Sequence, residues 1–457
     1  MQLRDYQADG IEAIRAAYRR TQRRVLYALP TGAGKTLMFS WIAHSATERG
    51  RTTLILVHRR ELIAQNEAAL RSVGETRYGV IAAGREATSA PIQIASKDTL
   101  VARLGRYQDW LATVDAIIVD EAHHATAGTW QTILDAAPGA YVLGVTATPC
   151  RKSGAGLGTY FDELIEGPAY SQLQAAGYLV PARVFAPSTV KVKAKKRGGD
   201  YVTKDVEEAL QKSTIVGDAI ESYQRWGDNL PAIAFCHSRK AVDRTAAAFR
   251  DAGYSAYGVD GTTPLEHRDA VCRGLATGDT QVLVSCDLIS EGFDVPAASV
   301  GIMLRPTASL GLWIQQAGRM LRPADGKADA RILDHVGNTL THGFPDEDRD
   351  WSLEDGAPPS PGEAAIAVVT CQSCFRAIRP VAVCPHCGAE RQPTEREIQQ
   401  REGELAELER ERAKRDKRKE EARADTFEDL LAIERARGYK PGWAHHRWRA
   451  RQRRRVG

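Results

Sequence analysis

The sequence lacks any long hydrophobic run, and this absence excludes a protein with membrane-spanning helices. No stretch of the 457 residues approaches the ~18 consecutive apolar residues that such a helix requires. The first ten residues, MQLRDYQADG, also lack the cationic segment followed by an apolar run that marks a secretory signal. We therefore expect a soluble, cytoplasmic protein with no membrane partner.

Excess charge of either sign is also missing, and aromatic residues are few. The formal net charge is +4 and aromatic residues make up 7% of the chain, so the overall composition does not indicate a nucleic-acid binder. The charge is nevertheless uneven, because the final fourteen residues, AHHRWRARQRRRVG, contain six arginines and no acid. Such a tail is typical of a segment that binds phosphate or an acidic surface, and equally of a solvated terminus without fixed structure.

Cysteine is scarce, but its spacing points to a site. Four of the eight cysteines lie among apolar or small neighbours and are expected to be reduced thiols: Cys150, Cys236, Cys272 and Cys286. The other four form two Cys-x₂-Cys pairs separated by nine residues, which is the ligand pattern of a structural tetrahedral zinc site: Cys371, Cys374, Cys384 and Cys387. Two disulfides are the alternative, and a cytoplasmic location disfavours them.

Short apolar runs that alternate with helical patterns predict an α/β fold with two parallel-sheet domains in tandem. VLYAL, TTLILVH, PIQIAS, AIIVD and YVLGVTA fall between residues 23 and 148. AIAFCH, SAYGVD, QVLVSC, VGIML and ARILDH fall between residues 232 and 335. Apolar runs of this length are typical of buried parallel strands. Between the two series, Pro181–Asp200 is predicted to form a crossover with a lysine-rich hairpin, or a linker without function.

The predicted organisation has six parts. They are 1–165 and 166–345, the two sheet domains; 346–367, an acidic and proline-rich linker; 368–392, the zinc module; 393–425, an exposed charged helix; and 426–457, a basic tail.

The stretch LPTGAGKT, Leu29 to Thr36, lies between the apolar run VLYA and the helical pattern LMFSWIAHSA. A nucleotide phosphate loop requires this strand–loop–helix context. Gly32 and Gly34 would let backbone N–H groups turn toward an anion, and Lys35 would reach the terminal phosphates. The Thr36 hydroxyl would hold Mg²⁺. Position 29 is Leu where the full pattern begins with Gly, and a tight turn without a nucleotide is the alternative.

A second candidate site is IIVDEAHHAT, where two acids and two histidines follow an apolar run within five positions. Four potential ligands so close together suggest a metal site. Downstream of a phosphate loop, Asp120 would contact nucleotide-bound Mg²⁺ and Glu121 would orient and deprotonate the attacking water. A pair of surface acids is the alternative. For His124 the residues support no function, and we expect a packing or surface position.

These stretches and several others, taken in order over about residues 1 to 340, resemble the superfamily 2 helicases of the DEAD/DEAH group. LRDYQADGIEAI resembles the Q motif, LPTGAGKT motif I, LILVHRRELIAQ motif Ia, DEAH motif II and GVTATP motif III. AIAFCHSRKAVD resembles motif IV, SEGFDVP motif V, and QQAGRMLRP motif VI.

The resemblance implies two RecA-like domains with ATP and Mg²⁺ bound between them. It implies these nucleotide-binding residues: Arg4, Gln7, Thr31, Gly32, Ala33, Gly34, Lys35, Thr36, Asp120, Gly292 and Asp294. It implies that the catalytic residues are Lys35, Asp120, Glu121, Gln315, Arg319 and Arg322, with the two arginines as arginine fingers. His123, Thr146 and Thr148 would couple hydrolysis to domain motion, and Arg59 and Arg60 would hold the nucleic-acid backbone.

The zinc module behind two such domains is similar to RadD-type bacterial DNA repair helicases and to related phage helicases. That resemblance implies an ATP-dependent DNA helicase or translocase in replication, recombination or repair. It would act as a monomer on single-stranded or branched DNA, with single-strand-binding protein as a candidate partner. An RNA helicase, or a non-unwinding ATP-gated DNA clamp or annealing factor, is the alternative.

Overall fold

The computed structural model describes residues 3–59, 61–124, 128–151, 156–186, 194–210, 215–286, 295–354, 368–391 and 426–436, together with 442, 444, 445 and 448. Residues up to Ala389 form one compact unit, and Glu390–Gly457 form a second. Within the described residues no helix is both long enough and apolar enough to cross a membrane.

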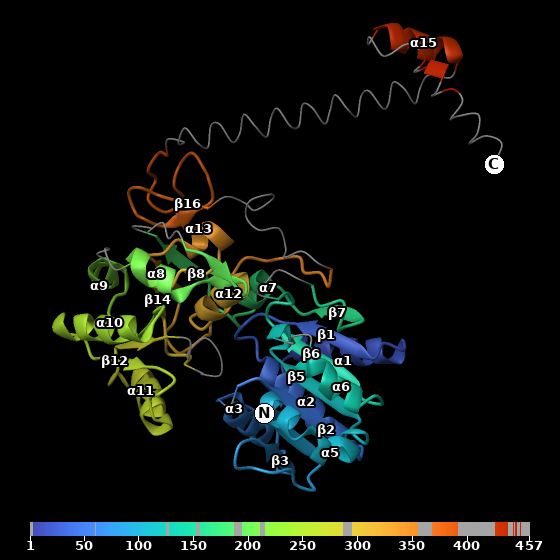
Figure 1. Cartoon of the computed structure of the whole chain (residues 1–457). Coiled ribbons are helices and arrows are strands. Elements are labelled where there is room, and N and C mark those ends of the chain that lie inside the picture. Colours follow the sequence, from blue (N-terminus) through green and yellow to red (C-terminus); the bar gives the residue numbers. More distant parts are fainter. Residues whose placement is uncertain are drawn as a thin grey trace. The chain divides into compact units, whose positions relative to one another are not determined.

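A parallel seven-stranded sheet forms the first domain, in the order β3-β4-β2-β5-β6-β1-β7 (Figure 1). Its strands are β1 (Arg24–Ala28), β2 (Thr53–Val57), β3 (Tyr78–Ile81), β4 (Ile92–Ser96), β5 (Ala116–Asp120), β6 (Tyr141–Thr146) and β7 (Glu163–Glu166). Its helices are α1 (Asp5–Arg19), α2 (Lys35–Thr47), α3 (Glu61–Ser72), α4 (Lys97–Ala102), α5 (Leu104–Leu111) and α6 (Thr129–Ala136).

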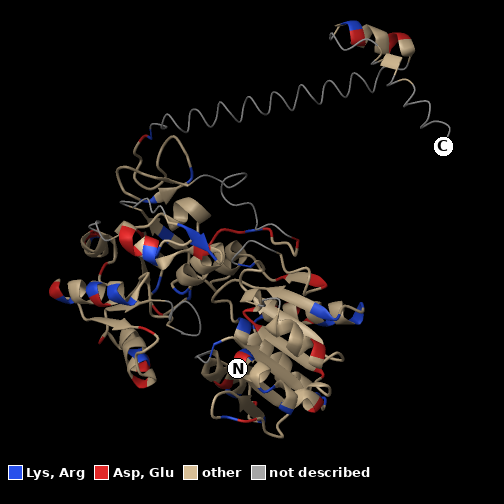
Figure 2. Ribbon diagram, in the orientation of Figure 1, with Lys and Arg blue, Asp and Glu red and all other residues tan. Residues whose placement is uncertain are grey.

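The central strands of this sheet are mostly apolar because helices cover both of their faces. One hydrophobic cluster joins the sheet to α1, α2 and α3 through residues such as Ile11, Phe39 and Leu62. A second cluster joins it to α4, α5 and α6 through residues such as Leu100 and Trp130. Charged residues gather instead on helices, for example on α10 (Arg239–Asp251) of the second domain (Figure 2).

The second domain is a parallel six-stranded sheet in the order β12-β13-β11-β14-β15-β8. Its strands are β8 (Ala182–Phe185), β11 (Ala232–Phe235), β12 (Ala256–Val259), β13 (Val282–Ser285), β14 (Val300–Met303) and β15 (Ala330–Asp334). Its helices are α8 (Thr203–Leu210), α9 (Ile215–Trp226), α10 (Arg239–Asp251), α11 (Leu265–Thr277), α12 (Leu310–Gly318) and α13 (Asn338–His342), and α7 (Tyr170–Ala175) lies between the two domains in sequence.

Three smaller parts and the 3₁₀ helix η1 (Ala122–His124) complete the described chain. The predicted lysine-rich hairpin is confirmed as the antiparallel pair β9 (Lys196–Arg197) and β10 (Asp200–Tyr201). The cysteine segment contains the antiparallel pair β16 (Val369–Thr370) and β17 (Ala377–Ile378). In the second unit, α15 (Phe427–Ala436) buries Leu430 and Ile433 against Ala444. The predicted charged helix at 393–425 lies outside the described residues.

The two tandem parallel sheets that the sequence predicts are present, and all ten predicted strands appear within a residue or two of their expected positions. β7 ends at Glu166, one residue beyond the predicted boundary at 165. The loops that follow β1, β5 and β6 all leave the carboxyl edge of the first sheet, because neighbouring parallel strands end on the same side. This edge brings together the phosphate loop, the acid pair and the predicted motif III.

Candidate active site

The phosphate loop connects β1 to α2, as the sequence predicts. Gly32 and Gly34 have φ angles of 89° and 81°, and residues with a Cβ atom rarely adopt this backbone conformation. Lys35 begins α2, and its Nζ donates to the carbonyl oxygen of Leu29 at 3.2 Å. Burial lowers the pKa of Lys35. The loop therefore holds a buried cation beside the positive end of a helix, an environment that favours a bound anion.

The acid pair lies at the end of β5, next to the phosphate loop. Asp120 is 4% exposed, and burial followed by the neighbouring Glu121 carboxylate raises its pKa to about 7. The φ angle of Glu121 is 51°, and its backbone N–H donates to Asp120 Oδ1 at 3.0 Å. A positive φ is uncommon for residues other than glycine and indicates local strain. The strain and the like charge both fit a carboxylate pair that a cation would stabilise.

Gln7 of the predicted Q motif contacts the backbone of the phosphate loop. Its side chain is buried, and its Nε2 donates to the carbonyl oxygens of Ala33 and Gly34 at 3.4 and 3.2 Å. Its Oε1 accepts from the backbone N–H of Arg4 at 3.0 Å. The sequence reasoning missed Tyr6, whose hydroxyl also donates to the Ala33 carbonyl, at 2.7 Å. This segment therefore supports the shape of the loop as well as lining the space around it.

His123 joins the two domains. Its Nδ1 lies 2.9 Å from Thr146 Oγ1, and its Nε2 lies 3.2 Å from the Gln315 amide nitrogen on α12 of the second domain. Because an amide nitrogen can only donate, His123 Nε2 accepts that bond and Nδ1 carries the proton. Thr146 Oγ1 in turn donates to the Thr148 carbonyl at 3.1 Å. The structure thus places His123 against both motif III and the second domain.

Arg319 and Arg322 follow α12 and approach the phosphate loop from the second domain. Arg319 is 6% exposed, and the Arg322 side chain passes so close to Gly32 that a Cβ at Gly32 would lie 3.1 Å from Arg322 Cγ. A Cβ at Gly318 would lie 2.7 Å from the Cβ of Thr31. Glycine at position 318 therefore permits the close approach of the two domains that brings both arginines to the loop.

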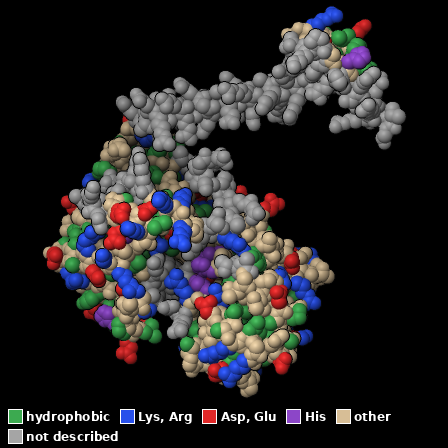
Figure 3. Space-filling model, viewed as in Figure 1, with side chains coloured by type: hydrophobic (Ala, Val, Ile, Leu, Met, Phe, Trp, Pro, Cys, Tyr) green, Lys and Arg blue, Asp and Glu red, His purple; other side chains and the backbone are tan. Residues whose placement is uncertain are grey.

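One cavity of about 1380 Å³ lies between the domains, and its lining includes these predicted residues: Arg4, Gln7, Thr31, Gly32, Gly34, Lys35, Thr36, Asp120, Glu121, Arg319 and Arg322. The lining does not include Tyr6, Ala33, Gly318, His123, Gln315 or the two threonines of motif III. Figure 3 shows Lys, Arg and His side chains along the groove where the two domains meet. The sequence reasoning missed the opposite wall, which includes Arg268, Cys272 and Arg273 of α11. No local motif marks these residues, and only the packing of the second sheet brings α11 to the cavity. The volume exceeds that of a typical small-ligand pocket and accommodates a nucleotide.

The remaining predicted residues divide into three groups. Arg59 follows β2 and does not line the cavity. Arg60, Gly292 and Asp294 lie outside the described residues. His124 stacks between His58 and His123, with ring centroids 4.2 Å from each, so its expected packing position is present.

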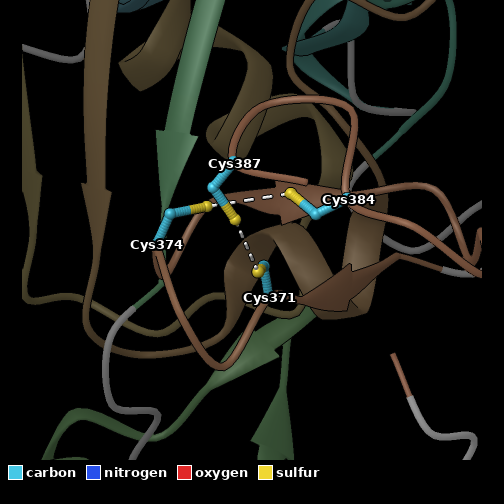
Figure 4. A group of neighbouring side chains, drawn as sticks. All are labelled: Cys371, Cys374, Cys384 and Cys387. Atoms are coloured by element: carbon cyan, nitrogen blue, oxygen red, sulfur yellow. Dashed lines mark hydrogen bonds between the residues drawn. The ribbon is translucent and has the colours of Figure 1, made fainter. Parts of the chain in front are cut away.

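The four clustered cysteines meet in a second site, separate from the cleft (Figure 4). The Sγ atoms of Cys371 and Cys387 lie 3.7 Å apart, and those of Cys374 and Cys384 lie 3.8 Å apart. A disulfide needs a sulfur separation of about 2.05 Å. Four sulfurs around zinc at about 2.3 Å are separated by about 3.8 Å. The arrangement therefore fits a metal and excludes the two disulfides.

The electrostatics of this site also suit a cation. A hydrogen bond from the backbone N–H of Cys374 lowers the pKa of the Cys371 thiol to about 6. Burial raises the pKa of the Cys374 thiol to about 12. Since neighbouring thiolates repel one another, all four ionise together only when a cation lies between them.

The cysteine segment packs against the second domain. The backbone N–H of Ala186, just after the edge strand β8, donates to the Phe375 carbonyl at 2.9 Å. Phe185 stacks on Trp226 with ring centroids 5.1 Å apart, and Trp226 in turn contacts the Phe375 ring. Ala377 belongs to the main hydrophobic core. The segment therefore covers the otherwise open edge of the second sheet.

Two families and several known proteins match the chain. The type III restriction enzyme res subunit family matches residues 1–151, and the helicase conserved C-terminal domain family matches residues 214–324. A 51.5 kDa protein of a Lactococcus phage is 34% identical over 379 residues, which cover 81% of this chain and 79% of that protein. The chain belongs to the superfamily 2 helicases.

Two more distant matches are a yeast relative and a solved structure of the same fold. The putative ATP-dependent helicase IRC3 of Saccharomyces cerevisiae is 28% identical over 365 residues, 73% of this chain and 51% of that protein. The chain therefore spans about half the length of this yeast relative. The DNA-bound structure of the ATP-dependent type ISP restriction-modification enzyme LlaBIII has the same fold, with a TM-score of 0.55 and 17% identity over 74% of this chain and 28% of that one.

Proposed function

We propose that this superfamily 2 helicase hydrolyses ATP in the cleft between its two domains and uses the resulting motion to translocate along DNA or unwind it. One observation carries the proposal. The phosphate loop and the acid pair of the first domain share a single cavity with Arg319 and Arg322 of the second. A nucleotide in this cavity is sensed by both domains at once, and its hydrolysis changes what each of them contacts.

The chain supplies every group that phosphate transfer to water requires. Lys35 and the N–H groups of the loop bind the phosphates, and Thr36 and Asp120 would hold Mg²⁺, which would neutralise phosphate charge. Glu121 accepts a proton from the attacking water as its oxygen bonds to the γ-phosphorus. The bond from that phosphorus to the bridging oxygen breaks, and ADP keeps the electron pair.

The second domain completes the site only when the cleft is closed. Arg319 and Arg322 donate to the oxygens of the transferring phosphoryl group, which stabilises its charge. The His123–Gln315 hydrogen bond joins the acid strand to the helix that carries these arginines. Opening of the cleft separates the arginines from the phosphates and breaks this bond. Cleft closure and hydrolysis are coupled by these contacts.

Two observations support DNA as the nucleic acid along which the protein moves. The chain shares its fold with a DNA-bound ATP-dependent enzyme, and its relatives include helicases. Arg59, and Arg60 beside it in sequence, would hold phosphodiester groups, contacts that give affinity without sequence preference. For the cysteine site we propose one Zn²⁺, held by four thiolates in a closed structural site. The sulfur separations of 3.7 and 3.8 Å support this assignment.

The test is ATP turnover measured alone and with single-stranded DNA, forked DNA or matched RNA. We expect DNA to stimulate turnover, and Arg319→Ala to abolish the stimulated rate, whereas Arg250→Ala, an exposed arginine on α10, leaves it unchanged. Turnover that no DNA stimulates, or an Arg319→Ala protein with normal turnover, would contradict the proposal. Stimulation by RNA alone would identify an RNA helicase. Stimulation by DNA without strand or triplex displacement would identify an ATP-gated clamp.

A further inference from the structure

The hairpin β9–β10 presents three consecutive cations and no outward acid. Gly198 and Gly199 have φ angles of 63° and 86°, which form the tight two-residue turn between the strands. Lys195, Lys196 and Arg197 precede this turn, and all three side chains are exposed. Because a strand pair of only two residues each has almost no core of its own, the hairpin must be held by another part of the protein.

The acid of the hairpin, Asp200, points inward and performs this docking. Its Oδ1 accepts from the Thr307 hydroxyl at 2.9 Å and from the backbone N–H of Ala308 at 2.8 Å. Its Oδ2 lies 3.5 Å from the Arg305 guanidinium. Tyr201 is half-buried and packs against the main hydrophobic core. The negative charge of Asp200 is thus paired with groups of the second domain. The outward side of the hairpin keeps its positive charge.

The loop that receives Asp200 leads directly into α12. The Ser309 side chain caps this helix by accepting from the Leu312 N–H at 3.3 Å. The backbone N–H of Thr307 donates to the Asn338 side chain at 3.0 Å, which fixes the loop from the other side. The helix then carries Gln315, and Arg319 follows it. One short and well-connected path therefore runs from the hairpin to the residues proposed to sense ATP.

We propose that the hairpin 195–201 binds the phosphodiester backbone of a nucleic-acid strand and that Asp200 transmits this binding to α12. The inference rests on the proposed function and adds to it a binding surface that no helicase motif contains. Three adjacent cations, one of them a guanidinium suited to bidentate phosphate contact, provide affinity without base readout. Asp200 is a positioning residue, because it acts through the loop at 305–309.

The surface is tested directly by binding to labelled single-stranded DNA. Fluorescence anisotropy measures the affinity between about 50 and 300 mM salt. The variant is Lys195→Ala/Lys196→Ala/Arg197→Ala. The control removes the same charge from three exposed arginines of the first domain: Arg19→Ala/Arg49→Ala/Arg106→Ala. We expect the hairpin variant to bind roughly tenfold more weakly, with a salt slope about 2 smaller, because three phosphate contacts are lost. Its turnover without DNA should equal that of the wild type.

A hairpin variant with the affinity and salt slope of the control would overturn the inference, whatever the ATPase result. A wild-type protein that binds DNA without stimulated turnover would instead contradict the proposed function. The DNA-affinity comparison would still test whether the hairpin binds DNA.

The role of Asp200 is tested by the same two measurements. Asp200→Ala keeps the three cations but loses the hydrogen bonds to Thr307 and Ala308. We expect it to keep the wild-type salt slope while DNA stimulation of turnover falls several-fold. Asp200→Asn retains an acceptor oxygen at Oδ1 and should recover much of the stimulation. Equal stimulation in the wild type and Asp200→Ala would show that the hairpin binds without transmitting.

Discussion

The cleft and the cysteine cluster are both built from potential metal ligands, yet they hold those ligands in opposite ways. In the cleft, Asp120 is buried and the adjacent Glu121 is partly buried on a strained backbone, and the two arginines that face the same cavity lie on a different domain. In the cysteine cluster, all four sulfurs come from one short segment that packs on a single domain. The first arrangement depends on contacts across a gap, and the second does not.

This difference suggests how one chain can keep the contacts that serve ATP turnover apart from the contacts that stabilise the fold. In the proposed mechanism, interactions across the cleft form and break in every cycle, so they cannot contribute permanently to the folded state. The cysteine segment covers a sheet edge, and in the proposed zinc site four thiolates leave no open position for chemistry. Changes in the cleft should therefore affect turnover with little effect on stability, and changes in the cysteine site should do the reverse.

The strongest test of this separation is Glu121→Gln. The amide cannot accept the proton of the attacking water, so we expect ATP turnover to fall at least about 100-fold. Nucleotide affinity and melting temperature should stay at or above wild-type values, because the substitution removes a like charge beside Asp120. Phosphate release, titration with a fluorescent nucleotide and thermal unfolding give the three readouts. Glu221→Gln, at an exposed position of α9, is the matched control. A large drop in melting temperature would break the comparison.

Removal of the metal from the cysteine site is the converse test. Cys384→Ser/Cys387→Ser should reduce bound zinc from one atom per chain to none. It should also cost about 2 kcal/mol, or roughly 5 °C in melting temperature, because the segment over β8 loosens. ATP turnover at about 25 °C should stay within about twofold of the wild-type rate. Cys286→Ser should change neither zinc content nor melting temperature. Stoichiometric zinc in the double variant would refute the four-thiolate assignment.

Gly318→Ala sharpens the cleft side of the comparison. The new Cβ would lie 2.7 Å from the Thr31 Cβ, so the domains must move apart and carry Arg319 away from the phosphate loop. We expect turnover to fall about tenfold, since a small displacement of catalytic groups has a large effect on rate. Gly217→Ala is the control, because a Cβ at this helical position meets no neighbouring atom. Normal turnover in Gly318→Ala would show that the close approach of the domains is not needed.

The sequence carries enough information for most of the fold. Buried parallel strands such as β2 and β5 are continuous apolar runs, and such runs are visible without any structure. The two unpredicted strands of the first sheet are its two edges, β3 and β7. β7 reads ELIE and is only partly buried, so its polar ends conceal it. Edge strands need less apolar sequence because one side is open.

The candidate site was predictable where its residues are adjacent in sequence and not where folding brings them together. The phosphate loop and the acid pair are local patterns. The His123–Gln315 bond joins residues 192 positions apart, and the α11 wall of the cavity has no motif at all. The packing of the cysteine segment on β8 was likewise invisible, because the spacing of the thiols encodes a metal site but not the surface beneath it.

The weakest expected effect concerns that surface. Arg379 forms an ion pair with Glu347, and its guanidinium lies 5.0 Å from the centre of the Phe344 ring, so it ties the cysteine segment to the chain that follows α13. Because the Arg379 side chain is 34% exposed, solvent screens the pair, and Arg379→Ala should cost at most about 1 kcal/mol. The melting temperature should fall by roughly 2 °C, with zinc content and turnover unchanged. Arg391→Ala provides the comparison at an arginine just beyond this unit in sequence. Loss of turnover in Arg379→Ala, without loss of zinc, would show that the cysteine segment takes part in the motion of the cleft rather than only supporting the second domain.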